Sequence, residues 1–128
     1  MVAAVTNGIK VSVVTEYQPF YSDPSRYHFA FSYRIKIENN SDATVQLMRR
    51  RWEIFDATYH KYEVKGDGVV GIQPVIEPGK SHEYVSGCNF NSVIGKMEGE
   101  FYMERLIDGK QIEVIIPKFV MIVPYILN

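Results

Sequence analysis

The residues whose spacing comes nearest to a known chemical motif are Gly66, Gly68 and Gly71, which form a G-x-G-x-x-G pattern. In dinucleotide-binding folds a helix begins at this pattern, and the free N–H groups and dipole of its first turn face the pyrophosphate. Here Ile72-Gln73-Pro74 and Glu77-Pro78-Gly79 follow the glycines, and prolines at that spacing break a helix. The G-x-x-x-x-G-K-S/T pattern of a P-loop is absent as well. The sequence therefore excludes both helix-based phosphate sites.

An anion site that needs no helix is left open by these glycines. Successive backbone N–H groups around glycines can hold an anion in a turn, and the run Arg49-Arg50-Arg51 can add charge-assisted hydrogen bonds. Alternatively, the glycines serve only turns and close strand crossings, and the arginines lie on a solvated surface or contact a partner protein. The candidate ligand-binding residues are Gly66, Gly68, Gly71, Arg49, Arg50 and Arg51.

Other residue types that carry chemistry are too scattered to predict a catalytic or metal site. His28, His60 and His82 lie far apart in the chain, with no H-x-H or cysteine pair to set a ligand geometry. Cys88 has no second thiol and no neighbouring base, which favours burial over nucleophilic chemistry. No pair of carboxylates has the spacing of a catalytic acid and base. We therefore predict neither an enzyme, nor a bound metal, nor a cofactor.

Length and charge favour a single neutral domain over residues 1–128. Lys and Arg number 14 against 15 Asp and Glu, so the chain has no positive excess for binding nucleic acid. Residues 1–14 lack the basic start and apolar run of a signal peptide. No apolar run reaches the roughly 18 residues of a membrane helix. We expect a cytoplasmic protein with neither a nucleic acid nor a membrane as partner.

Strand-forming residues dominate the segments that must position these glycines and arginines. Nine Tyr and seven Phe favour pleated, half-buried surfaces over helices. Apolar and polar residues alternate over residues 27–37, which predicts a long strand with one face in the core. The polar residues 39–42 then predict a hairpin turn. Between Leu47 and Trp52 the apolar positions change parity, which predicts a β-bulge near Arg49 to Arg51.

The remaining segments complete an all-β pattern. The first strand is predicted to begin after Asn7-Gly8, and residues 66–99 are predicted to form a loop-rich middle. Asp108-Gly109 predicts a two-residue hairpin, and Phe119 to Val123, apolar on both faces, predicts a strand buried twice or covering a partner subunit. Trp52 is expected in the core. Seven or eight such strands predict an antiparallel β-sandwich of the immunoglobulin or fibronectin type III kind.

Several short motifs follow one another in an order that resembles the ApaG family. They are Gly66-Asp67-Gly68-Val69-Val70-Gly71-Ile72-Gln73-Pro74, Pro78-Gly79, Tyr84-Val85-Ser86-Gly87 and Gly95-Lys96-Met97-Glu98-Gly99, with Arg51-Trp52 upstream. The resemblance extends from about Val11 to Pro124. It implies a sandwich similar to fibronectin type III, in agreement with the strand pattern. It also implies an association with cobalt and magnesium resistance or efflux.

From these observations we expect a non-enzymatic β-sandwich that binds a protein partner, which the resemblance to domains of eukaryotic F-box proteins also implies. The glycine- and proline-rich middle would supply rigid surface loops, and preformed loops lose little entropy on binding. The alternative is a small-ligand module that binds a pyrophosphate or nucleotide anion at the Gly66–Gly71 loop, with a divalent metal as a further alternative. The strand edges and Phe119 to Val123 also permit a homodimer.

Overall fold

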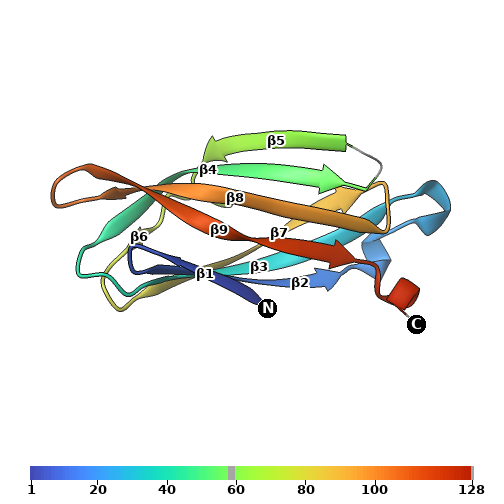
Figure 1. Cartoon of the computed structure of the whole chain (residues 1–128), viewed down its shortest axis with the longest axis horizontal. Helices are drawn as coiled ribbons and strands as arrows, with labels where there is room; N and C mark the ends of the chain where they lie inside the picture. Colours follow the sequence, from blue (N-terminus) through green and yellow to red (C-terminus); the bar gives the residue numbers. More distant parts are fainter. Residues whose placement is uncertain (58–59, 128) are drawn as a thin grey trace.

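The protein, described here from a computed structural model over residues 1–57 and 60–127, consists of two antiparallel sheets packed face to face (Figure 1). One sheet has the strand order β1-β2-β3-β7, and the other has the order β5-β4-β8-β9, with β6 paired to β4. The strands are β1 (Val2–Thr6), β2 (Ile9–Tyr17), β3 (Phe29–Asn39), β4 (Val45–Asp56), β5 (His60–Asp67), β6 (Val75–Ile76), β7 (Ser81–Phe90), β8 (Ile94–Arg105) and β9 (Lys110–Ile122). The predicted antiparallel β-sandwich is confirmed, with nine strands in the described residues instead of seven or eight.

The helical segments of residues 1–57 and 60–127 are three short 3-10 turns. They are η1 (Pro19–Tyr21), η2 (Pro24–Arg26) and η3 (Pro124–Leu127). None of these segments has the length or the apolar composition that crossing a bilayer as a helix would require.

The first sheet begins earlier than the sequence predicted. Asn7 and Gly8 have φ angles of 50° and 80°, as the two central residues of a type I′ turn do. They join β1 to β2, so that Val5 pairs with Lys10. The prediction that the ordered part starts at Asn7-Gly8 was wrong, because these residues are the turn of a hairpin whose first strand alternates too weakly to be recognised.

The chain changes sheets after β3, so the hairpin predicted at residues 39–42 was wrong. β3 pairs with β2 and β7, whereas β4 belongs to the second sheet. The fully buried Asn39 shapes this crossing. Its Nδ2 donates to the carbonyl oxygens of Ala43 and Ile76, both at 2.8 Å, and its Oδ1 accepts from the backbone N–H and the hydroxyl of Ser41. One amide side chain therefore links the end of the first sheet to β6 of the second.

The β-bulge lies in β4, one residue before the predicted position. The register with β8 shifts between Leu47 and Arg49, so Met48 is the extra residue. The shift turns Trp52 into the core, where 3% of its surface is exposed. Its ring contacts that of Tyr33 on the first sheet and that of Phe119 on β9, with centroid distances of 5.6 and 5.8 Å. The core position predicted for Trp52 is confirmed.

The last two strands differ from the sequence prediction at both ends. Arg105 pairs with Lys110 across a four-residue loop in which Gly109 alone has a positive φ. Asp108-Gly109 is therefore not a two-residue turn; the Asp108 carboxylate instead forms an ion pair with Arg105. In the segment from Phe119 to Val123, Phe119, Met121 and Val123 are buried while Val120 is half-exposed, so this strand is buried on one face.

Residues 66–99 contain less loop than predicted. β7 alone accounts for ten residues of this segment, and the first half of β8 lies in it as well. The glycines that suggested loops include Gly87 and Gly99, which lie within β7 and β8. Gly99 allows close backbone approach, a role that strand glycines also serve, because a Cβ there would lie 1.9 Å from the Arg51 carbonyl oxygen.

Candidate functional site

The three arginines and the first glycine of the motif lie on two paired strands. Arg50 pairs with Gly66 across β4 and β5, and Arg51 pairs with Lys65. Because alternate residues of a strand face opposite sides, Arg50 shares the inner face with Trp52, while Arg49 and Arg51 point outward. The triplet is therefore divided between the two faces of the second sheet.

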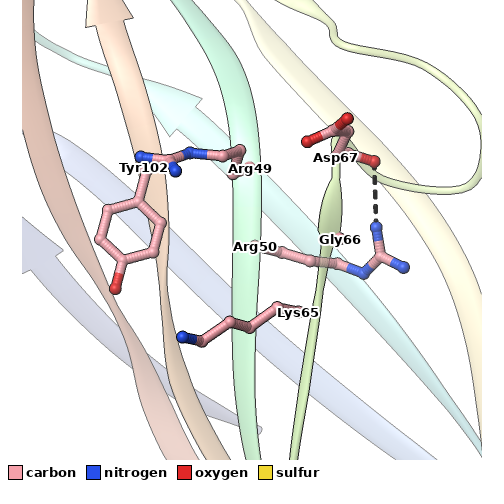
Figure 2. A pocket seen from close by; sticks show the side chains of 6 residues that line it. All are labelled: Arg49, Arg50, Lys65, Gly66, Asp67 and Tyr102. Carbon is pink, nitrogen blue, oxygen red and sulfur yellow. Dashed lines mark hydrogen bonds between the residues drawn. The ribbon is translucent and has the colours of Figure 1, made fainter.

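Arg50 binds the beginning of the glycine loop. Its Nη1 donates to the carbonyl oxygen of Asp67 at 3.0 Å, as Figure 2 shows. The same Nη1 donates to the carbonyl oxygen of Gly68 at 2.9 Å. Gly66 makes room for the guanidinium, because a Cβ at this position would lie 2.8 Å from its nitrogens. The arginine thus stabilises loop carbonyls, and its positive charge faces oxygen atoms of the protein itself.

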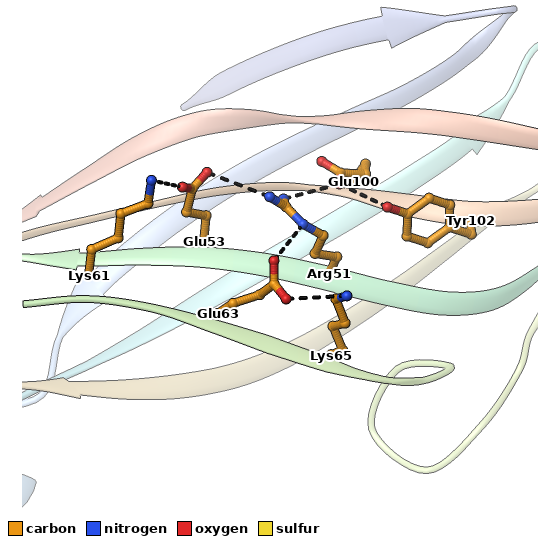
Figure 3. Close-up of polar contacts among 7 residues, drawn as sticks. All are labelled: Arg51, Glu53, Lys61, Glu63, Lys65, Glu100 and Tyr102. Atoms are coloured by element: carbon orange, nitrogen blue, oxygen red, sulfur yellow. Dashed lines mark hydrogen bonds and ion pairs between the residues drawn. The ribbon is translucent and has the colours of Figure 1, made fainter.

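Arg51 is the centre of an ion-pair network on the outer face (Figure 3). Its guanidinium lies 3.0 Å from Glu63, 3.1 Å from Glu100 and 3.8 Å from Glu53. The charge of Glu100 is the main cause that raises the pKa of Arg51, and the hydrogen bond with Lys65 is the main cause that lowers the pKa of Glu63. Carboxylates already surround Arg51, so it is occupied within the sheet.

Arg49 has its guanidinium stacked on an aromatic ring. It lies over Tyr102, 5.2 Å from the ring centre, in an arrangement that favours a cation over the ring face. Arg49, Arg50, Lys65, Gly66, Asp67 and Tyr102 line one pocket of about 430 Å³ (Figure 2). Of the predicted ligand residues, the structure brings Arg49, Arg50 and Gly66 together here; Arg51 is outside this pocket.

Gly68 and Gly71 serve a tight turn beyond the pocket. Val69 and Ile72 exchange two backbone hydrogen bonds, of 2.8 and 3.1 Å, and Val70 and Gly71 between them have φ angles of 47° and 81°. A type I′ turn has this form and prefers Asn or Asp at the first of these positions. Val70 occupies it instead, although a positive φ is strained for a β-branched residue. Gly68 cannot be replaced, because its φ is 59° and a Cβ would lie 2.0 Å from the Ile72 carbonyl oxygen.

The turn is held firmly against β4. The carbonyl of the bulge residue Met48 accepts from the Gly68 N–H at 2.9 Å and from Nε2 of Gln73 at 3.0 Å. Leu47 N–H donates to the Pro74 carbonyl at 3.0 Å. Val69 is buried beneath the turn. The bulge and the glycine motif therefore form one unit, in which an extra residue on β4 supplies the acceptor that fixes the loop.

This fixed loop presents apolar side chains to solvent. Val70 is 63% exposed, and Ile72 and Val75 are each about half-exposed. Loop residues on a rigid scaffold commonly carry binding functions. The glycines of the sequence indicated this loop. The exposed aliphatic surface could not be predicted, because the sequence does not reveal that Val69 is buried and Val70 is exposed.

The histidines and the cysteine lie in separate environments. His28 lies beside Asp23 in an isolated bridge, His60 begins β5, and His82 on β7 stacks with Tyr84. Among residues 1–57 and 60–127, no three His, Cys, Asp or Glu side chains are grouped closely enough to hold one metal ion. Cys88 has its Sγ 3.5 Å from Sδ of Met121. Burial raises the pKa of this thiol to about 12, so it is protonated at neutral pH.

Comparisons with known proteins agree on one family. The family model described as the ApaG domain matches residues 19–105. A protein called Protein ApaG from Brucella canis is 46% identical over 124 residues, which cover 97% of this chain and 95% of the relative. Another Protein ApaG, from Anaeromyxobacter dehalogenans, is 44% identical over the whole of both chains. A crystal structure of the putative ApaA protein from Bordetella pertussis has a TM-score of 0.87 at 38% identity, covering 91% of this chain and 94% of that one.

Proposed function

The chain belongs to the ApaG domain family, and from that premise we propose that it is a non-enzymatic module that binds another protein through the loop at residues 66–75. The observation that carries this proposal is the pairing of exposure and rigidity in the loop. Val70, Ile72 and Val75 lie in solvent, while the backbone beneath them is bonded to β4. A preformed apolar surface binds with little loss of conformational entropy.

The conformation of Val70 supports the same role. A β-branched side chain at positive φ costs of order 1 kcal/mol or more, and such strain is retained at functional sites. Val70 gains little from the core in return, since most of its surface is in solvent. We infer that this strain is retained for a contact that Val70 makes outside this chain.

Affinity capture from a cell lysate tests the loop. The Val70→Asn variant replaces the apolar side chain with the residue that a type I′ turn prefers, so the loop should keep its shape. We expect it to recover the partner at least about fivefold less well, as the loss of a central apolar contact of about 1 kcal/mol implies. The readout is quantitative mass spectrometry of the captured proteins.

Two controls accompany that experiment. Val5→Asn makes the same change at a position on β1 that is 67% exposed, and it should leave capture unchanged. Thermal unfolding of Val70→Asn should show a Tm equal to or above that of the wild type, because strain is relieved. Equal recovery of every protein by wild type and Val70→Asn would remove the loop from the proposal.

A second candidate function is anion binding at the pocket of Figure 2. Arg49 favours it, because its guanidinium contacts a ring while Arg50 and Arg51 contact oxygens of the protein. Calorimetric titration with pyrophosphate is expected to show binding that Arg49→Ala weakens by about tenfold, as the loss of one charge-assisted contact implies. Undetectable heat at millimolar pyrophosphate would exclude this candidate.

The proposal extends to the setting in which the module acts. We expect it in the cytoplasm. An effect on cobalt or magnesium resistance, which the family resemblance implies, would then be indirect and would act through the bound partner.

A further inference from the structure

β7 has one edge without a neighbouring strand. In the described sheets it pairs with β3 alone, over its full length from Ser81 to Phe90. The opposite end of the same sheet is covered, because Thr6 on β1 accepts a hydrogen bond from the Ile115 N–H on β9 at 3.1 Å. The two margins of the sandwich are therefore different: one is closed by contact between the sheets, and the β7 margin is open.

The backbone groups that face this free edge follow from two hydrogen bonds. Asn39 N–H donates to the Lys80 carbonyl at 3.0 Å, in continuation of the β3–β7 register. Residue pairs of an antiparallel ladder alternate between bonded and non-bonded, so even-numbered residues of β7 bond to β3. On the other side of β3, Gln18 N–H donates to the Ala30 carbonyl, which gives the same alternation. The backbone N–H and C=O groups that point toward the free edge, within the plane of the sheet, belong to Ser81, Glu83, Val85, Gly87 and Asn89.

This edge lacks the features that usually prevent strand pairing. Natural edges carry Lys or Pro, or charged side chains, that discourage another strand. The free edge of β5 follows this rule with Lys61, Glu63 and Lys65. β7 contains no Lys, Arg or Pro, and its one acid, Glu83, forms an ion pair with Arg34 at 3.2 Å.

Apolar surface beside the edge is incompletely covered. Tyr62 and Val64 on β5 pair with Ile54 and Trp52 and so face the interior of the sandwich, yet 44% and 36% of their surfaces are exposed. β5 is the outermost strand on this side of the molecule, beyond β7 (Figure 1). On the inner face of β7, the buried Tyr84 hydroxyl has no hydrogen-bond partner within the described part of the chain. One more strand beside β7 would cover the exposed parts of Tyr62 and Val64.

The outer face of the edge is shaped to receive side chains. A shallow groove of about 510 Å³ lies over β3 and β7, lined among others by Val85, Gly87, Ala30, Ser32 and Tyr21. Small residues form its floor, and the exposed Tyr21 ring from η1 borders it. A strand added to β7 would place alternate side chains in this groove and the intervening ones toward β5.

We propose that the free edge of β7 binds an extended segment of another protein as an additional strand. This mode, called β-augmentation, draws affinity from backbone hydrogen bonds and specificity from alternate side chains. The segment has apolar residues at the positions that face Tyr62 and Val64. The inference rests on the protein-binding role proposed above and names the form of the partner. Two copies joined through β7 by a two-fold axis would bring the projecting β5 of each against the other's second sheet, so the occupant is a single strand.

The test uses a library of random twelve-residue peptides displayed on phage and selected on the full chain. Peptides that bind should carry apolar residues at every second position. Hydrogen exchange with a selected synthetic peptide should slow the amides of Glu83, Val85 and Gly87. Those of Tyr84 and Ser86 should change little, because they already bond to β3. This alternation distinguishes strand addition from contact at the surface of the sheet.

Two variants at one position separate the backbone from the side chain. Val85→Pro removes an outward N–H without breaking a bond of the native sheet, and we expect it to weaken peptide binding at least about tenfold. Val85→Ala keeps that N–H and should weaken binding less. If Val85→Pro lowers the Tm by more than about 10 °C, Val85→Lys, which adds edge charge, replaces it.

The remaining results either contradict strand addition or separate it from binding at the loop. A selection that gives no peptide able to protect these amides, or peptides that bind wild type and Val85→Pro equally, would overturn strand addition. Protection that appears without peptide and grows with protein concentration would identify a second copy as the occupant. A lysate partner lost with Val70→Asn but kept by Val85→Pro would support the loop and exclude the edge. Peptides that bind Val70→Asn normally but not Val85→Pro would support the edge alone.

Discussion

Replacement of Trp52 by alanine is expected to lower the free energy of unfolding by about 3 to 5 kcal/mol. The indole is buried between the sheets and contacts Tyr33 on one and Phe119 on the other. Its removal leaves a cavity that the surrounding strands can fill only in part, so both burial and packing are lost. A domain of this size has a total stability of about 5 to 15 kcal/mol, so the variant should be close to its unfolding limit. Guanidinium denaturation followed by circular dichroism measures the change.

The matched control is Val120→Ala on the strand that carries Phe119. Val120 points outward and is half-exposed, so its truncation should change stability by less than about 0.5 kcal/mol. A loss below about 1 kcal/mol for Trp52→Ala would mean that the three-ring contact between the sheets does not stabilise the fold as described.

Gly99→Ala is expected to destabilise the protein by about 1 to 3 kcal/mol, or more. Gly99 lies in β8 opposite Trp52, and a Cβ there would be 1.9 Å from the Arg51 carbonyl oxygen. Backbone atoms cannot move aside as a flexible side chain can, so β4 and β8 must separate at the centre of the sheet. The same denaturation experiment measures the loss, and backbone amide exchange at Arg51 and Trp52 should increase.

Gly87→Ala serves as the control for a glycine in a strand. Its Cβ would meet only the Phe31 carbonyl oxygen, at 3.3 Å, on the exposed outer face of β7. The Phe31 carbonyl oxygen has to shift by only a few tenths of an ångström, so we expect a change below about 1 kcal/mol. If Gly99→Ala were no more destabilising than Gly87→Ala, the close approach of β4 and β8 would not limit residue size at Gly99.

Periodicity predicted the parts of the fold that depend on burial. The parity of Val45 and Leu47 against Trp52 and Ile54 requires an extra residue between them, because one face of β4 is in the core. The structure places that residue at Met48. The same reasoning predicted Trp52 in the core. The burial of one face of a strand produces a local alternation of apolar and polar residues, and this alternation can be recognised in a single sequence.

Pairing and partner choice could not be predicted in this way. Nothing local distinguishes a turn that forms a hairpin from one that crosses to the other sheet, as the segment after Asn39 does. The three consecutive arginines look alike in sequence, yet one bonds loop carbonyls, one binds carboxylates and one stacks on a ring. The contacts of each arginine are set by residues of β5 and β8. Those residues lie beside the arginines because of the pairing register of β4 with these two strands.

The placement of β7 also constrains how the protein folds. β3 pairs on one side with β2, its neighbour in sequence, and on the other with β7, which follows β4, β5 and β6 along the chain. Such distant pairing raises the contact order, and sandwiches of high contact order fold in milliseconds to seconds. During synthesis the edge of β3 that pairs with β7 therefore stays open until β4, β5, β6 and β7 have emerged from the ribosome. A chaperone that protects this nascent edge would be expected to raise the yield of native protein.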